Sequence, residues 1–198
     1  VCTMLLSSGL VTFASFAVGD DSNSADSVPA EDVSRYEMDF NSNWKFNLGD
    51  VPTARYKAYS DSEWRTVELP HDFSIEQDFT NSGTETESGN LPGGTGWYRK
   101  MFTLPGGIRG KRIILNFDGA YSDTYVYVNN KYVGENHYGY NSFSFDITDY
   151  IACNGSTVNL IAVKVVNEIP NSRWYSGSGI NRDVTLTITD PVHVAHYG

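Results

Sequence analysis

Apolar and polar residues alternate with a period of two in several segments from Phe40 onward. Such alternation places one face of a β-strand in a core and the other in water. The segment Val158–Val166 differs, because it is apolar on both faces apart from Asn159 and Lys164, and it therefore predicts a central strand covered on both sides. The alternating segments that predict half-buried strands are Trp44–Leu48, Arg112–Asp118, Tyr125–Val128, Ser142–Ile147 and Asp183–Thr189.

Turn signals separate these segments. Val128-Asn-Asn-Lys131 predicts a hairpin, since Asn tolerates the positive φ of a type I′ turn. Pro105-Gly106-Gly107 and Asn154-Gly155 separate further strands, and the only helical expectation is one turn at Asp149–Ala152. About eight strands with turns between them predict an all-β sandwich or barrel, and we favour a jelly-roll β-sandwich.

The first 38 residues have a different composition. Residues 1–19 are apolar with small residues and no charge, which predicts the remnant of a secretory signal peptide whose basic front is missing. A membrane anchor is the alternative, but polar residues dilute a stretch already near the minimum length. Residues 20–38 are acidic and rich in serine, which predicts a disordered linker. We therefore expect a secreted or cell-surface protein.

The longest polar loop, Asp78–Pro92, is expected to be mobile or to contact a partner, because loops of this length usually have such a role.

Charge and cysteine content exclude several classes of function. The formal net charge is −10, which argues against binding to nucleic acid or to anionic membranes. Cys2 and Cys153 are not expected to pair, and no residue spacing indicates a metal site or a cofactor.

The stretch Asn171–Val184 is the candidate binding loop. It lies between two predicted strands and carries an Arg-Trp-Tyr triplet with glycine and serine turn points. Loops held by a rigid β scaffold commonly carry binding residues. Large planar side chains in such a loop suit a sugar site, because aromatic rings stack on pyranose faces and Arg bonds paired hydroxyls.

Six short motifs, in this order and spacing, resemble the N-terminal sugar-binding domain of glycoside hydrolase family 2, in particular of bacterial secreted β-galactosidases. They are Leu69–Phe73, Gly94–Lys100, Phe117–Gly119, Val126–Asn130 with Val133-Gly134, Phe145–Thr148, and Arg173–Ile180 with Arg182-Asp183. The resemblance implies a galactose-binding-like jelly roll over residues 39–191. It also implies that residues 192–198 begin an immunoglobulin-like domain, which a catalytic (β/α)₈ barrel would follow.

In this family the domain lends a loop to the rim of the barrel's active site and helps to hold the terminal sugar. The matching substrate-binding candidates are Asn171, Arg173, Trp174 and Tyr175. Some members carry an Asp near Asn171, and here Asn keeps the acceptor but loses the charge. The family's two catalytic carboxylates lie on the barrel, so the resemblance implies no catalytic residue in this chain and no hydrolysis by the chain alone.

Several alternatives stay open at this stage. Trp174 and Tyr175 could fill a domain interface instead of touching sugar, and Arg182-Asp183 could be a local ion pair. His71-Asp72 is expected to be structural, and Glu168 is expected to be a loop carboxylate although Asn167-Glu168 mimics the family's acid/base dipeptide. The whole chain could instead be an autonomous carbohydrate-binding module or a cell-surface adhesion module. β-Glucuronidases and β-mannosidases share the domain, so the sugar itself is not fixed.

Overall fold

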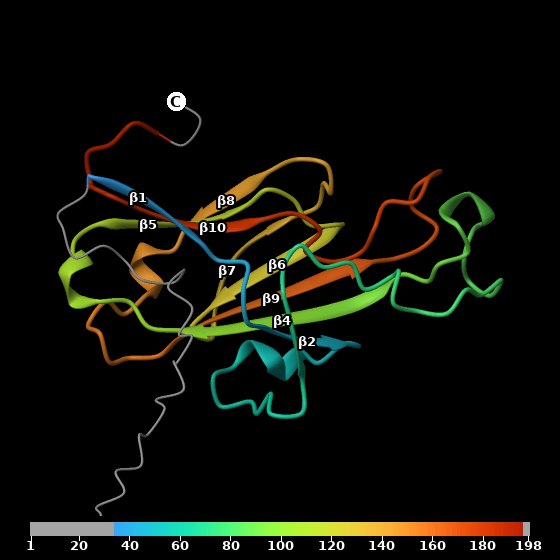
Figure 1. Cartoon of the computed structure of the whole chain (residues 1–198), viewed down its shortest axis with the longest axis horizontal. Coiled ribbons are helices and arrows are strands. Elements are labelled where there is room, and N and C mark those ends of the chain that lie inside the picture. Colours follow the sequence, from blue (N-terminus) through green and yellow to red (C-terminus); the bar gives the residue numbers. More distant parts are fainter. Residues whose placement is uncertain (1–33, 196–198) are drawn as a thin grey trace, which may run out of the picture.

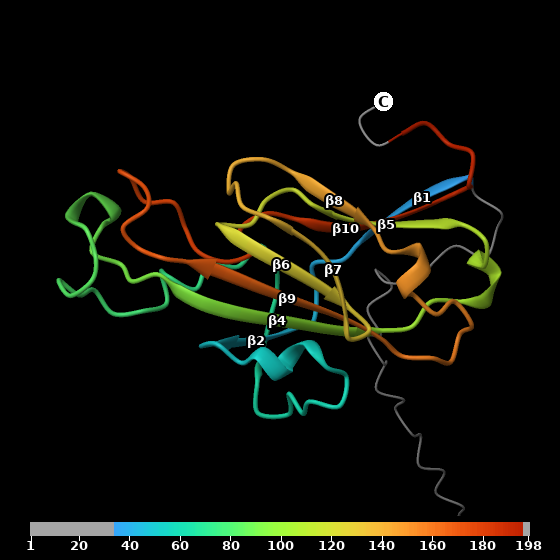
Figure 2. The same cartoon turned by 180° about the vertical axis from the view of Figure 1, so that it is seen from behind.

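The computed structural model describes residues 34–195 as two packed antiparallel sheets, which confirms the predicted all-β sandwich (Figures 1 and 2). One sheet has four strands in the order β1-β10-β5-β8, and the other has six in the order β3-β2-β4-β9-β6-β7. The ten strands are β1 (Arg35–Asp39), β2 (Trp44–Leu48), β3 (Arg65–Val67), β4 (Gly94–Phe102), β5 (Arg112–Phe117), β6 (Asp123–Val128), β7 (Lys131–Asn136), β8 (Phe143–Asp146), β9 (Asn159–Asn167) and β10 (Val184–Thr189).

Every segment with a clear period of two forms a strand, and its apolar positions face the space between the sheets, except Leu48 at the end of β2, which is exposed. Leu115, Val126, Val163 and Leu186 are fully buried members of this core. Four short 3₁₀ helices connect strands among the residues described. They are η2 (Pro52–Arg55), η3 (Thr86–Ser88), η4 (Gly106–Ile108) and η5 (Thr148–Tyr150). The part of the chain in view contains no helix with the length and hydrophobicity needed to cross a membrane.

Strand β9 is the central strand that its two apolar faces predict. It pairs with β4 on one side and β6 on the other. Its inner face joins the main core, while Leu160 and Ala162 pack on the outer face against Trp97, Trp64 and Ala54. The loop between β2 and β3 therefore covers the outer face of the six-stranded sheet.

The β6–β7 hairpin has the predicted turn. Asn129 and Asn130 have φ values of 47° and 74°, the left-handed pair that a type I′ turn requires. The side chain of Asn129 also donates to the carbonyl of Tyr150 at 2.7 Å and to Oδ1 of Asn159 at 2.9 Å. The turn is thus fixed by backbone conformation and by its neighbours.

The structure differs from the sequence-based expectation at the start of the sandwich. Strand β1 begins at Arg35, inside the range 20–38 expected to be linker, and pairs with β10. Tyr36 and Met38 of β1 pack on the core, so this short segment of alternating residues is an edge strand of the four-stranded sheet. The expected signal segment, most of the linker, Cys2 and the last three residues of 192–198 lie outside the described residues. Val192 and Val194 are exposed.

Arg99 is fully buried on the outer face of β4 and holds the covering loop in place. Its guanidinium donates to Asp61 Oδ2 at 2.8 Å, to the carbonyls of Tyr56 and Tyr59 at 3.0 and 3.2 Å, and to the carbonyl of Ala54. A buried charge is tolerated only with such a complete set of partners.

We expect Arg99→Met to lower the free energy of unfolding by about 3–5 kcal/mol, because Asp61 and the carbonyls lose their shared donor. Chemical denaturation measures the change. The control is Arg112→Met, whose pair with Asp146 is exposed, and it should cost less than about 1 kcal/mol. Equal losses in the two variants would contradict this role for Arg99.

Candidate functional site

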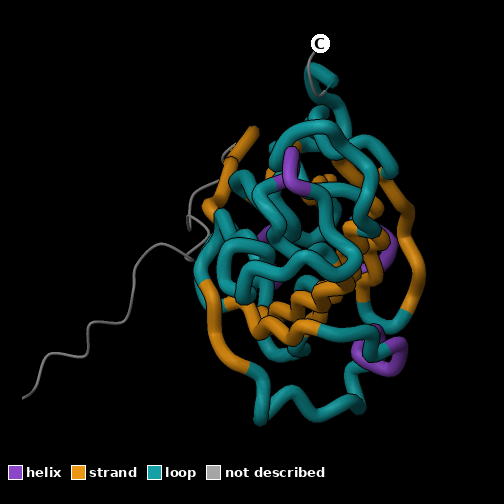
Figure 3. Tube along the Cα trace, turned by 90° about the vertical axis from the view of Figure 1, so that its right-hand side faces the viewer, coloured by secondary structure: helices purple, strands orange, loops and turns teal. Residues whose placement is uncertain are grey.

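The long loops gather at one end of the sandwich (Figures 1 and 2). The loop between β9 and β10 (168–183) lies there beside the loop between β3 and β4 (68–93). Figure 3 views the molecule from this end, with the loops in front of the strands. The candidate loop predicted from the sequence is the first of these two.

The base of the candidate loop is built into the sandwich. The N–H groups of His71 and Phe73 donate to the carbonyls of Ile180 and Ser178 at 2.7 and 2.9 Å. On the other side, Gly179 and Tyr121 exchange two backbone hydrogen bonds of 3.0 and 2.9 Å. Residues 177–180 are buried, so this base is a rigid support and not a free loop.

Polar side chains join the two loops and the end of β9 around Ser178. Its hydroxyl accepts from Asn167 Nδ2 at 2.6 Å and from the Ser74 hydroxyl at 2.5 Å. Its backbone N–H donates to Asp72 Oδ1 at 2.9 Å. We call Asp72, Ser74, Asn167 and Ser178 the polar knot.

Gly177 is required next to the polar knot. Its φ is +78°, a conformation that other residues adopt with strain. A Cβ at this position would also lie 3.1 Å from Asp72 Oδ2. The glycine therefore lets the chain turn closely around the Asp72 carboxylate.

The outer part of the loop, residues 171–175, carries all four predicted binding residues, and we call it the tip. The four residues form two groups. Asn171 and Tyr175 point their polar atoms back into the protein. Asn171 Oδ1 accepts from the Tyr121 hydroxyl at 3.3 Å, its amide donates to Asn167, and the Tyr175 hydroxyl donates to Asp72. Burial and the bond to Asp72 both raise the pKa of the Tyr175 hydroxyl, so Tyr175 stays protonated as a donor.

Arg173 and Trp174 form the outward group. The guanidinium carbon of Arg173 lies 5.1 Å from the centre of the Trp174 ring, and 65% of Trp174 is exposed. Within residues 34–195 the Arg173 guanidinium takes part in no hydrogen bond or ion pair. The two ends of the tip are held, and the two side chains between them are available to a ligand.

A pocket of about 460 Å³ lies beside the tip. It is lined by Asn171, Ser172 and Arg173 from one loop and by Glu85 and Glu87 from the other. The two carboxylates give the pocket acceptors that can bond hydroxyl groups. Sequence reasoning missed both glutamates, because the only signal was the unusual length of their polar loop.

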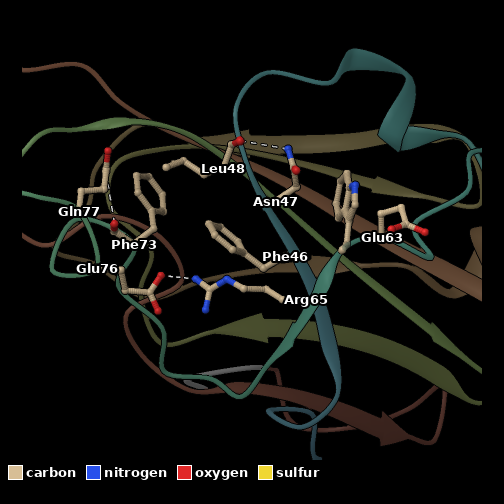
Figure 4. Close-up of a pocket in the computed structure, with 9 residues that line it drawn as sticks. Phe46, Asn47, Leu48, Glu63, Arg65, Phe73, Glu76 and Gln77 are labelled. Carbon is tan, nitrogen blue, oxygen red and sulfur yellow. Dashed lines mark hydrogen bonds and ion pairs between the residues drawn. The ribbon is translucent and has the colours of Figure 1, made fainter.

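A second pocket, of about 650 Å³, lies beside β2 and β3 and is less suited to a ligand (Figure 4). Its aromatic rings, Phe46 and Phe73, are buried. Arg65 and Glu76 pair with each other, and the Gln77 amide donates to backbone carbonyls. Glu63 is the one charged side chain of the lining without a hydrogen bond or ion pair among the residues described.

Two dipeptides that suggested paired side chains have separate partners. His71 Nδ1 bonds the Tyr98 hydroxyl at 2.8 Å, whereas Asp72 belongs to the polar knot, so both have the structural roles expected. The possible Arg182–Asp183 ion pair does not form. Arg182 donates to a backbone carbonyl, and Asp183 accepts from an Asn side chain. Glu168 is exposed just after β9, as a loop carboxylate should be.

Comparison with known proteins agrees with this geometry. The family model described as "Glycosyl hydrolases family 2, sugar binding domain" matches residues 38–191. The chain belongs to this family. It is the non-catalytic, sugar-binding domain of family 2 glycosidases, as the six motifs predicted, and the matched range coincides with the sandwich.

Relatives of this family 2 domain include enzymes with different sugars in their names. "Beta-galactosidase BoGH2A" of Bacteroides ovatus is 45% identical over 166 residues, which cover 83% of this chain and 19% of the relative. A "Putative beta-glucuronidase" of Formosa agariphila is 37% identical over 82% of this chain and 16% of its own length. The chain thus spans about a fifth of the length of these curated relatives.

Solved structures of the family superimpose on the sandwich. A glycosyl hydrolase family 2 member from Bacteroides cellulosilyticus has a TM-score of 0.79 and 43% identity, over 82% of this chain and 22% of that one. A β-glycosidase from Bacteroides vulgatus has a TM-score of 0.76 and 40% identity, over 81% and 21% of the two chains.

His71 makes the stability of this site depend on pH. Burial lowers the pKa of His71 below its ordinary value of 6.5, and this outweighs the nearby Glu76, which acts to raise it. In the unfolded chain the imidazole protonates at a higher pH than in the folded protein. The stabilising contribution of neutral His71 is therefore complete above pH 6.5 and is lost as pH falls toward its folded pKa.

We expect the free energy of unfolding to fall between about pH 7 and pH 5, and His71→Gln to weaken that dependence. Denaturant titrations at both pH values measure the slopes. If the free energy of unfolding of His71→Gln depends on pH as steeply as that of the wild type, a group other than His71 causes the dependence.

Asp72 fixes the outer end of the tip, because its carboxylate accepts from Ser74 N, Ser178 N and the Tyr175 hydroxyl. We expect Asp72→Ala to speed amide hydrogen exchange of residues 174–178 by about tenfold or more, since buried N–H groups lose their acceptor. Hydrogen-exchange mass spectrometry measures this. The control is Glu168→Ala, which removes an exposed carboxylate from the loop between β9 and β10 and should leave the exchange of residues 174–178 unchanged. Slow exchange in both variants would contradict the proposed anchoring.

Proposed function

We propose that this chain is the N-terminal part of a longer secreted or cell-surface bacterial β-galactosidase, and that its tip helps to bind a terminal β-galactoside. Arg173 and Trp174 are the residues that would touch sugar, with Asn171 and Tyr175 holding the tip in position. Immunoglobulin-like and barrel domains would follow, and residues 192–198 would begin the first of them. The apolar, small-residue pattern of residues 1–19 supports export.

The observation that carries this proposal is the exposed Arg173–Trp174 pair on an anchored tip. The Arg173 guanidinium, which has no hydrogen bond or ion pair within residues 34–195, offers five donors in a fixed fork, which suits neighbouring hydroxyl groups. The exposed Trp174 ring offers an apolar face to a pyranose. Because both ends of the tip are already ordered, little conformational entropy would be lost on binding.

Glu85 and Glu87 favour a neutral galactoside over a uronic acid at this tip. They line the same pocket as Arg173, so the local charge is two carboxylates against one guanidinium. A sugar carboxylate would meet repulsion from both, whereas sugar hydroxyls can donate to them. The 45% identity to a relative named as a β-galactosidase supports the same choice.

An autonomous carbohydrate-binding module is the second candidate function. Tyr138 and Tyr140 favour it, because they are 61% and 53% exposed in the loop between β7 and β8. Exposed aromatic rings on a sandwich can bind glycans without a neighbouring domain. The reading frame beyond Gly198 distinguishes the two candidates, since only the leading proposal requires a barrel there.

We expect Arg173→Ala in the full-length protein to lower kcat/KM for an aryl β-galactoside by about tenfold or more, because a ligand-contacting Arg is commonly a binding hot spot. Steady-state kinetics measures it, with circular dichroism to confirm folding. Arg109→Ala changes an exposed Arg at the opposite end of the sandwich and should have no effect. Equal kinetics in the two variants would refute the proposed contact.

A further inference from the structure

A third pocket, of about 640 Å³, lies where the same loop enters β10, and its side chains have no part in the leading proposal. It lies between Asp118 after β5, Tyr140 and Asn141 in the loop between β7 and β8, and Asn181–Asp183 before β10. Its volume falls within the range of about 300–1,000 Å³ that small-molecule sites occupy.

Asn181 provides the first sign of a ligand. Its side-chain oxygen is buried and has no hydrogen-bond partner among the residues described. A buried acceptor without a donor costs free energy, because the hydrogen bond that it made to water is not replaced. Asn181 lines the pocket, so a rotation of its side-chain amide would let a ligand hydroxyl supply the missing donor.

Arg182 provides the second sign. In the part of the chain described, its guanidinium makes one long hydrogen bond, 3.4 Å to the Asp118 carbonyl, and no ion pair. Its aliphatic stem packs across Gly119, where a Cβ would lie 2.9 Å from Arg182 Cδ. The side chain is therefore held in place while most of its donors remain unused.

Tyr140 supplies an exposed aromatic wall. Its ring is 53% exposed and lies edge-on to the Tyr121 ring, with centroids 5.4 Å apart. Gly139 packs against that same Tyr121 ring, which fixes the loop. The wall is thus supported from behind and open toward the pocket.

The charges around the pocket decide what class of ligand fits. Asp118 and Asp183 contribute two carboxylates and Arg182 one guanidinium, which gives a formal sum of −1. Planar donors and acceptors beside one aromatic face suit a ring that bears several hydroxyl groups. An anionic ligand would be repelled by the excess carboxylate.

We infer that this pocket is a second saccharide site, specific for a neutral pyranose. Asn181 and Arg182 bond the hydroxyl groups, and Tyr140 packs on the apolar face of the ring. The inference rests on these side chains and does not require Arg173 or Trp174 to bind sugar.

Amide chemical shifts of the ¹⁵N-labelled 198-residue chain test it, with methyl β-D-galactopyranoside and methyl β-D-glucuronide as probes. We expect saturable shifts at Asn141, Asn181 and Arg182 with the neutral probe, at a Kd on the order of millimolar. The glucuronide should bind more weakly. Asn181→Ala and Tyr140→Ala should each weaken binding by about tenfold, the size expected for one lost ligand contact.

Tyr132→Ala is the matched control, since it removes a similarly exposed Tyr, on β7, that does not line the pocket. Arg173→Ala separates this site from the tip and should leave these shifts intact. Absence of saturable shifts in the wild-type chain would overturn the inference, even if a pocket variant failed to fold. Shifts confined to residues 171–175, equal weakening by Tyr132→Ala, or tighter binding of the glucuronide would also overturn it.

Discussion

The buried hydroxyl of Ser178 is the contact on which the loop end of the sandwich depends. It accepts from Asn167 at the end of β9 and from Ser74 in the loop before β4, while Ser178 N–H donates to Asp72. Asn167, Ser74 and Ser178 are buried, and removing one of them would cost another a hydrogen bond. Two loops far apart in the sequence and the end of β9 are therefore ordered by one shared set of bonds.

This arrangement separates support from recognition within a few residues. Asn171 and Tyr175 use their polar atoms to fix the tip, so their side chains have little left for a ligand. Arg173 and Trp174 contact each other instead and stay exposed. An ordered tip with two free planar side chains can bind without first losing the entropy of a mobile loop.

Much of the fold could be predicted from the sequence. In strands such as β5 and β10, the alternation of apolar and polar residues within the strand itself shows which face is buried. The edge strand β1 was missed, since five alternating residues follow an acidic stretch that indicates disorder. The buried Arg99 was missed because its partner Asp61 is 38 residues away. For the site, composition identified the loop but not its anchor, since Asp72 and Tyr175 are 103 residues apart.

Tyr121 connects the tip to the third pocket. Its hydroxyl donates to Asn171 in the tip, and its ring meets Tyr140 on the wall of the pocket. Burial raises the pKa of Tyr121, so it remains a hydrogen-bond donor in this position. Because one side chain supports both surfaces, a change at Tyr121 would disturb the two together. Arg173 lines the pocket at the tip and Asn181 lines the third pocket, so changes at these two residues, unlike a change at Tyr121, can assign a sugar to one surface or the other.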